Sequence, residues 1–253
     1  MKENKVYPIK KAMILGAGEG LRLRPLTLDT PKTMIPIGGI PQIQHTLLWL
    51  KSHGIIEVAI NLHHLGDKIK AFVGDGSRFG LKVVYSEEKE LLGTAGGVKR
   101  MEDFLGERFV IVYGDILTDF NLSAMITQHV ENRAVATIAL FRPSNPSEVG
   151  LVQMDKTNRI LKFVEKPKTL PPELLPPQAN SGIYVMEKSV LQGVPRTGKY
   201  DFGFQVFPKL IEAGLPLFGY PIGPHDYLID IGTIEKYRLA NEDAKNGKIR
   251  MLH

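Results

Sequence analysis

Apolar positions along the chain fall into short strand-like runs that alternate with longer helical patterns. Runs rich in β-branched residues predict five strands, at 11–15, 57–61, 81–85, 109–115 and 135–142. Between them, apolar residues recur at a spacing near 3.6, which predicts helices at 41–53, 94–105 and 121–132. This alternation indicates an α/β fold with helices on both faces of a mostly parallel sheet.

The run FVIVYGD, residues 109–115, is the best candidate for a central strand. Its first five residues are all apolar, as expected of a strand that is covered on both faces. Asp115 follows the run, and open α/β sheets place their ligands beyond the carboxyl ends of such strands. We therefore expect Asp115 to lie at a functional site.

The pattern changes after residue 142. The proline-rich segments RPSNPSEVG and EKPKTLPPELLPP surround short strands expected at 150–155, 159–164 and 181–186. Two further helices are expected near 202–213 and 234–246. We interpret residues 1–253 as a single domain in which a second lobe, at 143–253, packs on a first lobe at about 1–142.

Composition narrows the classes of function. The 253 residues are 43% hydrophobic and include no cysteine, which excludes disulfide scaffolds, thiolate catalysis and cysteine-ligated zinc. No apolar run approaches the ~18 residues of a membrane span, so an untargeted cytoplasmic protein without a membrane partner is expected. The net charge is +5, but the 32 Lys and Arg residues are scattered among 27 acidic residues, which disfavours a nucleic-acid surface. An anionic small molecule is therefore the expected type of ligand. The seven histidines show no metal-ligand spacing.

The segment GAGEGLRLRPLTLDTPKTMIPIGG, residues 16–39, combines glycines with Arg22, Arg24 and Lys32. A dinucleotide fingerprint would need glycine where Leu21 stands and then a helix, which the prolines exclude. A Walker A loop would need Gly-Lys-Ser/Thr, which is absent. A plain glycine-rich turn stays open as an alternative. Close backbone approach and several cations together favour a polyphosphate, such as a triphosphate.

Five further motifs follow this loop in order: ELLGTAGGV (90–98), VYGDIL (112–117), VEKP (164–167), ANSGIYV (179–185) and DIGT (230–233). Together the six resemble the sugar-1-phosphate nucleotidyltransferases, and most closely the mannose- and heptose-1-phosphate guanylyltransferases. The resemblance implies a three-layer Rossmann-like nucleotidyltransferase fold, with a mixed, mostly parallel central sheet and a small sugar-binding lobe. The nucleotide-binding lobe would then be formed by residues 1–142, approximately, and the sugar-binding lobe and closing elements by residues 143–253. The resemblance also implies Mg²⁺-dependent transfer of a nucleotidyl group from a nucleoside triphosphate to a sugar 1-phosphate, with release of pyrophosphate.

The chain also departs from the family pattern. Ala17 and Leu21 stand where the family loop usually has glycine and threonine, and Leu228 stands where an aromatic residue is common. Longer relatives carry a C-terminal β-helix of hexapeptide repeats, which this sequence does not show. A second acyltransferase activity and assembly through a β-helix are therefore not expected. A homodimer is the expected assembly.

The resemblance assigns roles to residues that match its motifs. Catalysis falls to Arg22, Lys32, Asp115, Lys166 and Asp230, with Asp115 and Asp230 as Mg²⁺ ligands. Nucleotide binding falls to Leu15, Gly16, Ala17, Gly18, Glu19, Gly20, Arg22, Lys32, Gly93 and Thr94. Sugar-phosphate binding falls to Gly114, Gly150, Glu165, Lys166 and Asn180.

Simpler interpretations of several motifs stay open. Asp115 could be a turn or cap carboxylate, and DIGT followed by IEKY could be a helix-start signal. EKPK could be a charged turn, and Thr94 could begin an ordinary helix. A non-catalytic, regulatory relative that binds nucleotide sugars also stays open, whereas the prolines of the loop disfavour a nicotinamide oxidoreductase.

The nucleobase is predicted from its hydrogen-bonding edge. Guanine presents two adjacent donors, for which a carboxylate is the natural partner. Glu87, Glu88 and Glu90 precede the glycine of the LGTAGG stretch, and no glutamine occurs between Gln44 and Gln128. We therefore expect GTP as the nucleotide substrate, and the resemblance implies mannose 1-phosphate as the sugar substrate. A solvated acidic turn is the alternative for the glutamates. Heptose-1-phosphate guanylyl transfer, or thymidylyl, uridylyl or cytidylyl transfer to glucose 1-phosphate, is the alternative for the reaction.

Overall fold

The chain passes several times between two groups of elements. The computed structural model describes residues 9–250 and divides into unit 1, comprising Ile9, Leu92–Ile111 and Leu122–Gly223, and unit 2, comprising Lys10–Leu91, Val112–Asn121 and the chain from Pro224 on. The boundary that we expected near residue 142 lies inside unit 1, and the two lobes, defined by their ligands, stay a prediction. Residues 1–8 and 251–253 of the predicted domain lie outside the described residues.

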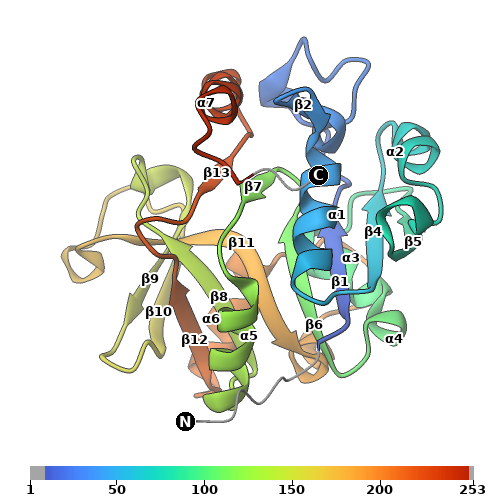
Figure 1. Ribbon diagram of the computed structural model, residues 1–253. Coiled ribbons are helices and arrows are strands. Elements are labelled where there is room, and N and C mark those ends of the chain that lie inside the picture. Colours follow the sequence, from blue (N-terminus) through green and yellow to red (C-terminus); the bar gives the residue numbers. More distant parts are fainter. Residues whose placement is uncertain (1–8, 251–253) are drawn as a thin grey trace, which may run out of the picture. The chain divides into compact units, whose positions relative to one another are not determined.

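Unit 2 contains three parallel strands in the order β1 (Lys11–Leu15), β4 (Glu57–Leu62) and β5 (Lys82–Glu87). Val58, Ala59 and Ile60 of β4 are completely buried, so the middle strand is covered on both faces, as parallel strands usually are. The connections contain helices α1 (Gln42–Ser52) and α2 (Gly66–Val73), as Figure 1 shows.

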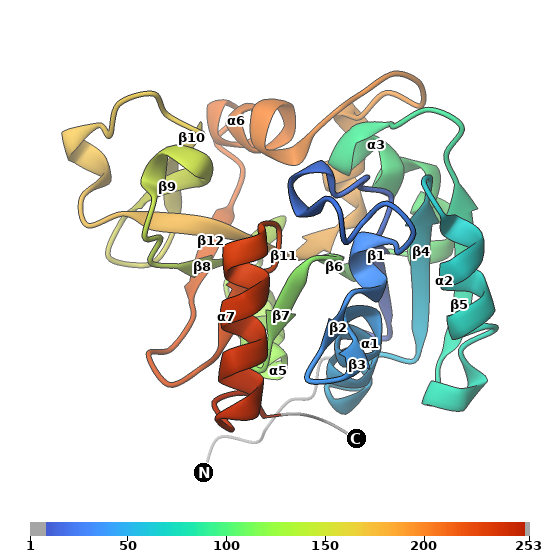
Figure 2. The ribbon, with the colours of Figure 1, turned by 90° about the horizontal axis from the view of Figure 1, so that it is seen from above.

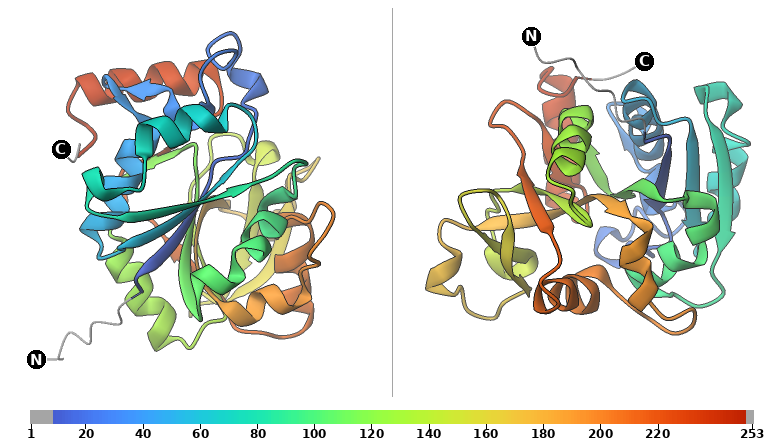
Figure 3. Two further views of the ribbon diagram at one scale, coloured as in Figure 1. Left: turned by 90° about the vertical axis from the view of Figure 1, so that its right-hand side faces the viewer. Right: turned by 90° about the horizontal axis from the view of Figure 1, so that it is seen from below.

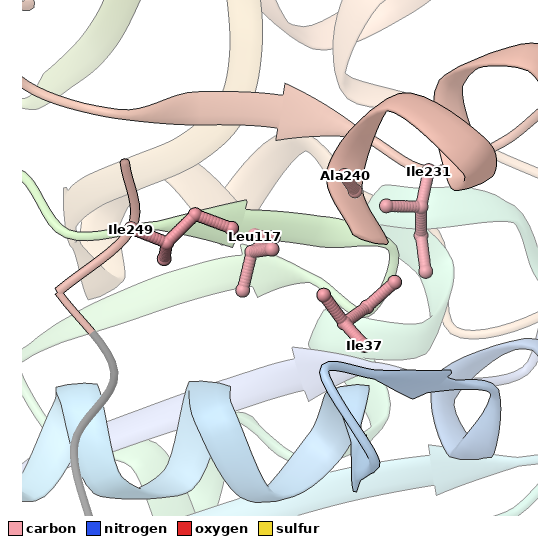
Figure 4. Packing of buried hydrophobic residues seen from close by; sticks show 5 residues of the cluster. All are labelled: Ile37, Leu117, Ile231, Ala240 and Ile249. Atoms are coloured by element: carbon pink, nitrogen blue, oxygen red, sulfur yellow. The ribbon is translucent and has the colours of Figure 1, made fainter. Parts of the chain in front are cut away.

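The rest of unit 2 is built from short elements. These are η1 (Leu21–Leu23), η2 (Lys32–Met34), η3 (Ser77–Phe79), β2 (Pro36–Ile37), β3 (Ile40–Pro41), β7 (Ile116–Thr118), β13 (Leu228–Asp230) and α7 (Ile234–Lys245). Strand β13 pairs antiparallel with β7 and leads into α7 (Figure 1), and Figure 2 shows α7 and β7 from above. An apolar cluster packs β2, β7, β13 and α7 together, and its buried residues are Ile37, Leu117, Ile231, Ala240 and Ile249 (Figure 4).

Unit 1 is mostly antiparallel. Its strands are β8 (Ala136–Phe141), β9 (Gly150–Met154), β10 (Ile160–Glu165), β11 (Gln178–Glu187) and β12 (Leu217–Pro221). Strand β8 lies between β11, its antiparallel partner, and β12, its parallel partner (Figures 1 and 3). The helical elements are α3 (Gly93–Arg100), α4 (Glu102–Leu105), α5 (Leu122–Glu131), η4 (Pro146–Glu148), η5 (Pro172–Leu174), η6 (Lys188–Gly193), η7 (Phe202–Val206) and α6 (Phe207–Glu212).

Aromatic side chains make up much of the core of unit 1. The ring centroid of Tyr184 lies 5.4 Å from that of Phe202 and 5.2 Å from that of Phe207, and both pairs have edge-on geometry. Phe163 packs on Phe207 with centroids 5.2 Å apart. This packing fixes η7 and α6 against β10 and β11, which is where the residues predicted to bind the sugar lie.

Strand β6 (Arg108–Tyr113) begins in unit 1 and ends in unit 2. Its residues 109–112 are all completely buried, which confirms the prediction that this run is a central, fully covered strand. Asp115 follows two residues after the end of β6. No helix among residues 9–250 has both the length and the apolar character needed to cross a membrane.

Most predicted elements are confirmed with shifts of a few residues, but two predictions need correction. The helix expected at 94–105 is two helices, α3 and α4, with Met101 between them. The helix expected at 202–213 begins as a π-helix, η7. The pattern missed α2, β7, β12 and β13, because short elements give too few positions for a period to emerge.

The buried His129 predicts how stability depends on pH. Its ring nitrogens lie 2.9 Å from Thr137 Oγ1 and 3.2 Å from Glu187 Oε1. Burial lowers the pKa of His129 to about 4, although Glu187 acts in the opposite direction. The unfolded chain, with a histidine pKa near 6.5, therefore binds more protons between these values. Stability from this residue is complete above about pH 6.5 and declines as the pH falls towards 4, by up to about 3 kcal/mol.

Urea unfolding at pH 7, 6 and 5 checks this expectation. The wild type should lose unfolding free energy over this range more steeply than His129→Gln, which cannot take up the proton. Equal pH slopes for the two proteins would contradict the assignment.

Candidate active site

The glycine loop follows β1 and is shaped by two of its glycines. The Gly16 N–H donates to Asn61 Oδ1 at 2.8 Å, and a Cβ at residue 16 would lie only 3.1 Å from the Asn61 carbonyl oxygen. Gly20 has a φ of 66°, and its carbonyl accepts from Thr27 Oγ1 at 2.8 Å. The close approach therefore favours glycine at residue 16, and the left-handed backbone favours it at residue 20. A Cβ at Gly18, by contrast, would meet nothing within 4 Å.

The prolines have the predicted effect on this loop, which contains two short 3₁₀ turns, η1 and η2, and no α-helix. Among residues 9–250, the backbone N–H groups of residues 17–20 donate to no acceptor in the chain. A run of free N–H groups on a glycine-rich turn is a suitable binding site for a phosphate.

Four predicted catalytic residues of unit 2 come together at Gly232. A Cβ on this glycine would lie 2.6 Å from Asp230 Oδ1, 2.9 Å from Arg22 Nη2 and 3.2 Å from Lys32 Nζ. The Lys32 ammonium forms an ion pair with Asp115. Arg22, Lys32, Asp115 and Asp230 therefore occupy one site, next to the glycine loop, although they lie far apart in the sequence.

The pairing of β7 with β13 brings the two aspartates together. Asp230 is opposite Ile116 in this ladder, and the Ile231 N–H donates to the Asp115 carbonyl at 2.9 Å. The Gly114 N–H donates to the Leu15 carbonyl at 3.0 Å, which ties the same turn to the end of β1. Gly114 and Leu15 thus hold the backbone of the site, and the sugar-phosphate role of Gly114 stays a prediction.

The two carboxyl groups are unequal in charge. Burial raises the pKa of Asp115, but the Lys32 ammonium and hydrogen bonds from Lys32 and Asp230 outweigh it, so the pKa lies below its ordinary value. Burial and the neighbouring Asp115 raise the pKa of Asp230, against the opposing effects of Lys32 and Lys236. Asp115 is therefore the more readily ionised member of the pair.

The donor set suits a hard divalent cation. Asp115 and Asp230 offer neighbouring carboxylate oxygens, which Mg²⁺ prefers, and Mg²⁺ keeps several water ligands when it binds to proteins. Within the described residues, no group of three or more His, Cys, Asp or Glu side chains could hold a metal. Water and phosphate oxygens would therefore complete a Mg²⁺ site at these two residues.

In unit 1, Glu165 lies against two glycines. It pairs with Gly150 across β9 and β10, and a Cβ on Gly150 would lie 2.6 Å from Glu165 Oε2. The same oxygen occupies the place of a Cβ on Gly203. Burial raises the pKa of Glu165, which Lys166 lowers in part and Asp201 raises further. Both glycines are thus needed to leave room for this carboxylate.

Lys166 has a strained backbone and an exposed side chain. Its φ is 45°, its N–H donates to the Val149 carbonyl at 3.2 Å, and Pro167 follows it. A residue before proline prefers extended backbone, and a left-handed conformation costs about 1–3 kcal/mol, so the surrounding strands must impose it. Such strain is commonly found at functional positions.

Asn180, the other predicted sugar ligand, has partners within the chain. Its Nδ2 donates to the Tyr184 hydroxyl at 2.9 Å, and its Oδ1 accepts from the Gly182 N–H at 2.9 Å. These bonds fix the orientation of the amide. A sugar contact of Asn180 stays a prediction.

The start of α3 is capped by a remote segment. The N–H and Oγ1 of Thr94 donate to Asp201 Oδ1 at 2.9 and 3.2 Å, and the N–H groups of Ala95 and Gly96 donate to the Tyr200 carbonyl at 2.9 and 3.0 Å. Gly93 has a φ of 76°, and a Cβ there would lie 2.6 Å from that carbonyl oxygen. The helix N-terminus therefore has its donors occupied, and the nucleobase contact of Gly93 and Thr94 stays a prediction.

Glu88 is the buried member of the three glutamates considered for base recognition, whereas Glu87 and Glu90 are exposed. Glu88 is 5% exposed, and its Oε1 accepts from Asn61 Nδ2 at 2.8 Å. Asn61 therefore links Glu88 to the glycine loop through Gly16. Glu87, by contrast, forms an exposed ion pair with Lys70.

Reasoning from the sequence missed several residues that contact the predicted site residues of each unit: Asn61, Gly232 and Lys236 in unit 2, and Asp201 and Gly203 in unit 1. Gly232 and Lys236 lie in or just after DIGT, where a search for tight approaches could have included them. Asp201 and Gly203 lie in KYDFGF, which carries no recognisable signal because their importance comes from contacts with distant residues.

Known proteins resemble the chain in sequence and in fold. Residues 11–247 match the family described as Nucleotidyl transferase. A UTP--glucose-1-phosphate uridylyltransferase of Synechocystis is 37% identical, with 95% of this chain and 64% of the relative covered. A mannose-1-phosphate guanylyltransferase of Mycobacterium tuberculosis is 34% identical, with 93% of this chain and 65% of the relative covered. The chain thus spans less than two thirds of the length of either relative.

A crystal structure from Bacillus anthracis, of a candidate glucose-1-phosphate thymidylyltransferase in complex with a sucrose, has the same fold. The TM-score is 0.83 at 26% identity, and the match covers 94% of this chain and 96% of that one. This likeness confirms the predicted α/β fold class, with its mixed and mostly parallel sheet. Because the family match extends over residues 11–247 and the relatives match nearly the whole chain, this chain belongs to the nucleotidyl transferase family.

Proposed function

We propose that this protein transfers a nucleotidyl group from a nucleoside triphosphate to a sugar 1-phosphate and releases pyrophosphate. The convergence of Arg22, Lys32, Asp115 and Asp230 at Gly232 is the observation that carries this proposal. Two cations and two candidate Mg²⁺ ligands lie beside a loop whose N–H groups at residues 17–20 have no acceptor among residues 9–250. A triphosphate needs this combination to be bound and aligned.

The reaction requires no general base. An oxygen of the sugar phosphate, already an anion at pH 7, forms a bond to the α-phosphorus while the bond to the leaving pyrophosphate breaks. Negative charge accumulates on the pyrophosphate, and Arg22 and Lys32 offset it. When bound at Asp115 and Asp230, Mg²⁺ would supply further positive charge at the phosphate oxygens.

Residues of unit 1 would bind the sugar phosphate. Glu165 is fixed between Gly150 and Gly203 and can accept hydrogen bonds from sugar hydroxyls. Lys166 presents an exposed ammonium to the phosphate and so aims the attacking oxygen. The strain at Lys166 supports this role because it fixes the direction in which the side chain leaves the backbone.

We propose GTP and mannose 1-phosphate as the substrates. Support comes from Glu88, a buried carboxylate that Asn61 connects to the glycine loop, and from the relative that is a mannose-1-phosphate guanylyltransferase. The second candidate is uridylyl transfer to glucose 1-phosphate, which the 37% identity to the Synechocystis relative favours. A non-catalytic, nucleotide-sugar-binding regulator is the alternative of another class.

Pyrophosphate release from a matrix of nucleoside triphosphates and sugar 1-phosphates tests the function. We expect GTP to exceed UTP and dTTP by at least about tenfold in kcat/KM, roughly the value of one charge-assisted contact. Inosine triphosphate, which lacks the N2 amino group, should fall between them. Glu88→Gln should reduce the preference because it keeps an acceptor for Asn61 but removes the charge, whereas Glu87→Gln serves as the surface control.

Equal use of UTP or dTTP with both mannose and glucose 1-phosphate would exclude guanylyl specificity but leave nucleotidyl transfer intact. Failure of every pair to release pyrophosphate would exclude the enzymatic function itself.

Substitution of the aspartates tests the metal site. Asp115→Asn and Asp230→Asn should each reduce turnover by at least about 100-fold, because a metal stabilises the transition state more than the bound substrates. Substrate binding should change less. Near wild-type turnover of both variants at saturating Mg²⁺ would show that these residues do not hold the metal.

Gly232→Ala tests the convergence of charges. The added methyl group would displace the ends of Asp230, Arg22 and Lys32, which are flexible side chains, so the fold should be kept. We expect kcat/KM to fall by about 100-fold, since small displacements of aligned groups are costly, with the melting temperature nearly unchanged. Gly193→Ala, where a Cβ meets nothing within 4 Å, is the matched control. A fully active Gly232→Ala protein would contradict this geometry.

A further inference from the structure

Lys236 contacts one of the two candidate metal ligands. Helix α7 begins at Ile234, and the N-cap Thr233 accepts a hydrogen bond from the Lys236 N–H at 3.3 Å. This places Lys236 in the first turn of the helix. From there its Nζ lies 3.3 Å from Asp230 Oδ2, and the lysine side chain is 35% exposed.

Each candidate metal ligand thus forms an ion pair with a different lysine. Lys32 pairs with Asp115, and Lys236 pairs with Asp230. The other oxygen of Asp230, Oδ1, accepts from the Gly232 N–H at 2.7 Å. Oδ2 is therefore the oxygen of Asp230 that forms the ion pair with the Lys236 ammonium, while Lys32 also lies close to this carboxylate. A divalent ion and an ammonium compete for one carboxylate because both are attracted to the same negative charge.

The charges of the site indicate where this ammonium can go. Arg22, Lys32 and Lys236 supply three positive charges against the two carboxylates Asp115 and Asp230, which leaves one positive charge in excess. A triphosphate carries more negative charge than this excess, even before the metal is counted. A lysine on a flexible four-carbon stem can leave a carboxylate and reach a phosphate without movement of the helix.

We propose that Lys236 is a further cation of the triphosphate site: it balances Asp230 in the free protein and binds the triphosphate once a divalent metal takes the carboxylate. This inference rests on the proposed function. It makes metal and nucleotide binding cooperative, because each ligand relieves a charge conflict that the other would meet alone. Loss of Lys236 therefore changes the two affinities in opposite directions.

Two binding titrations test this on the full chain. Free Mn²⁺ is followed by electron paramagnetic resonance, and a non-hydrolysable α,β-methylene analogue of GTP is titrated calorimetrically in the presence of Mn²⁺. Lys236→Met should bind Mn²⁺ alone about fivefold more tightly, the scale of a partly exposed ion pair. The same variant should bind the analogue at least about tenfold more weakly, the scale of a charged hydrogen bond.

Three variants serve as controls. Lys236→Arg keeps the charge and should retain most of the nucleotide affinity. Lys236→Gln serves if the methionine variant does not fold. Lys245→Met removes the same charge at the other end of α7, about 13 Å along the axis and beyond the ~8 Å screening length, and should change neither affinity.

The outcomes separate this inference from the proposed function. If Lys236→Met and Lys236→Gln leave both affinities unchanged, or weaken both, the inference is overturned while the metal site stands. If the wild type binds no Mn²⁺ with or without the analogue, the metal site fails and the inference fails with it. Opposite shifts in the two titrations support it, because a merely structural loss would lower both affinities.

Discussion

The candidate site of unit 2 depends on a short antiparallel pairing between β7 and β13. Asp115 and Asp230 lie far apart in the sequence, and bringing such distant segments together carries an entropic cost that grows with the loop between them. The apolar cluster around Ile37, Leu117 and Ile231 offsets that cost beneath the pair of strands (Figure 4). Burial of these side chains therefore holds the two carboxylates in place, against their mutual repulsion.

Both units use bare glycine backbone to seat a carboxylate. In unit 2 the Asp230 carboxylate lies against Gly232, and in unit 1 the Glu165 carboxylate lies against Gly150 and Gly203. A Cβ at any of these positions would occupy the space of a charged oxygen. These three glycines thus act by leaving room for side chains, whereas Gly20 and Gly93 have a left-handed φ.

The sequence predicted the parts of this structure whose signal is local. The apolar run at 109–112 indicated a buried strand, and the prolines of the glycine loop excluded an α-helix. Lys32 and Asp115, which are distant in the sequence, could each be recognised because each lies in a motif. The contacts of Asp201 and Gly203 could not be predicted in this way, because they depend on which distant residue lies opposite. The same is true of β13, which has three residues and shows no period.

The cap on α3 also bears on how the chain acquires its structure during synthesis. The helix has eight residues, of which three are glycines, so it is a poor helix on its own. The N–H groups of its first turn donate to Tyr200 and Asp201, and Asp201 is 107 positions after Thr94 in the sequence. The ribosome must therefore synthesise most of the protein before the first turn of α3 can be capped. A nascent chain released earlier would expose an uncapped, glycine-rich segment to chaperones and proteases.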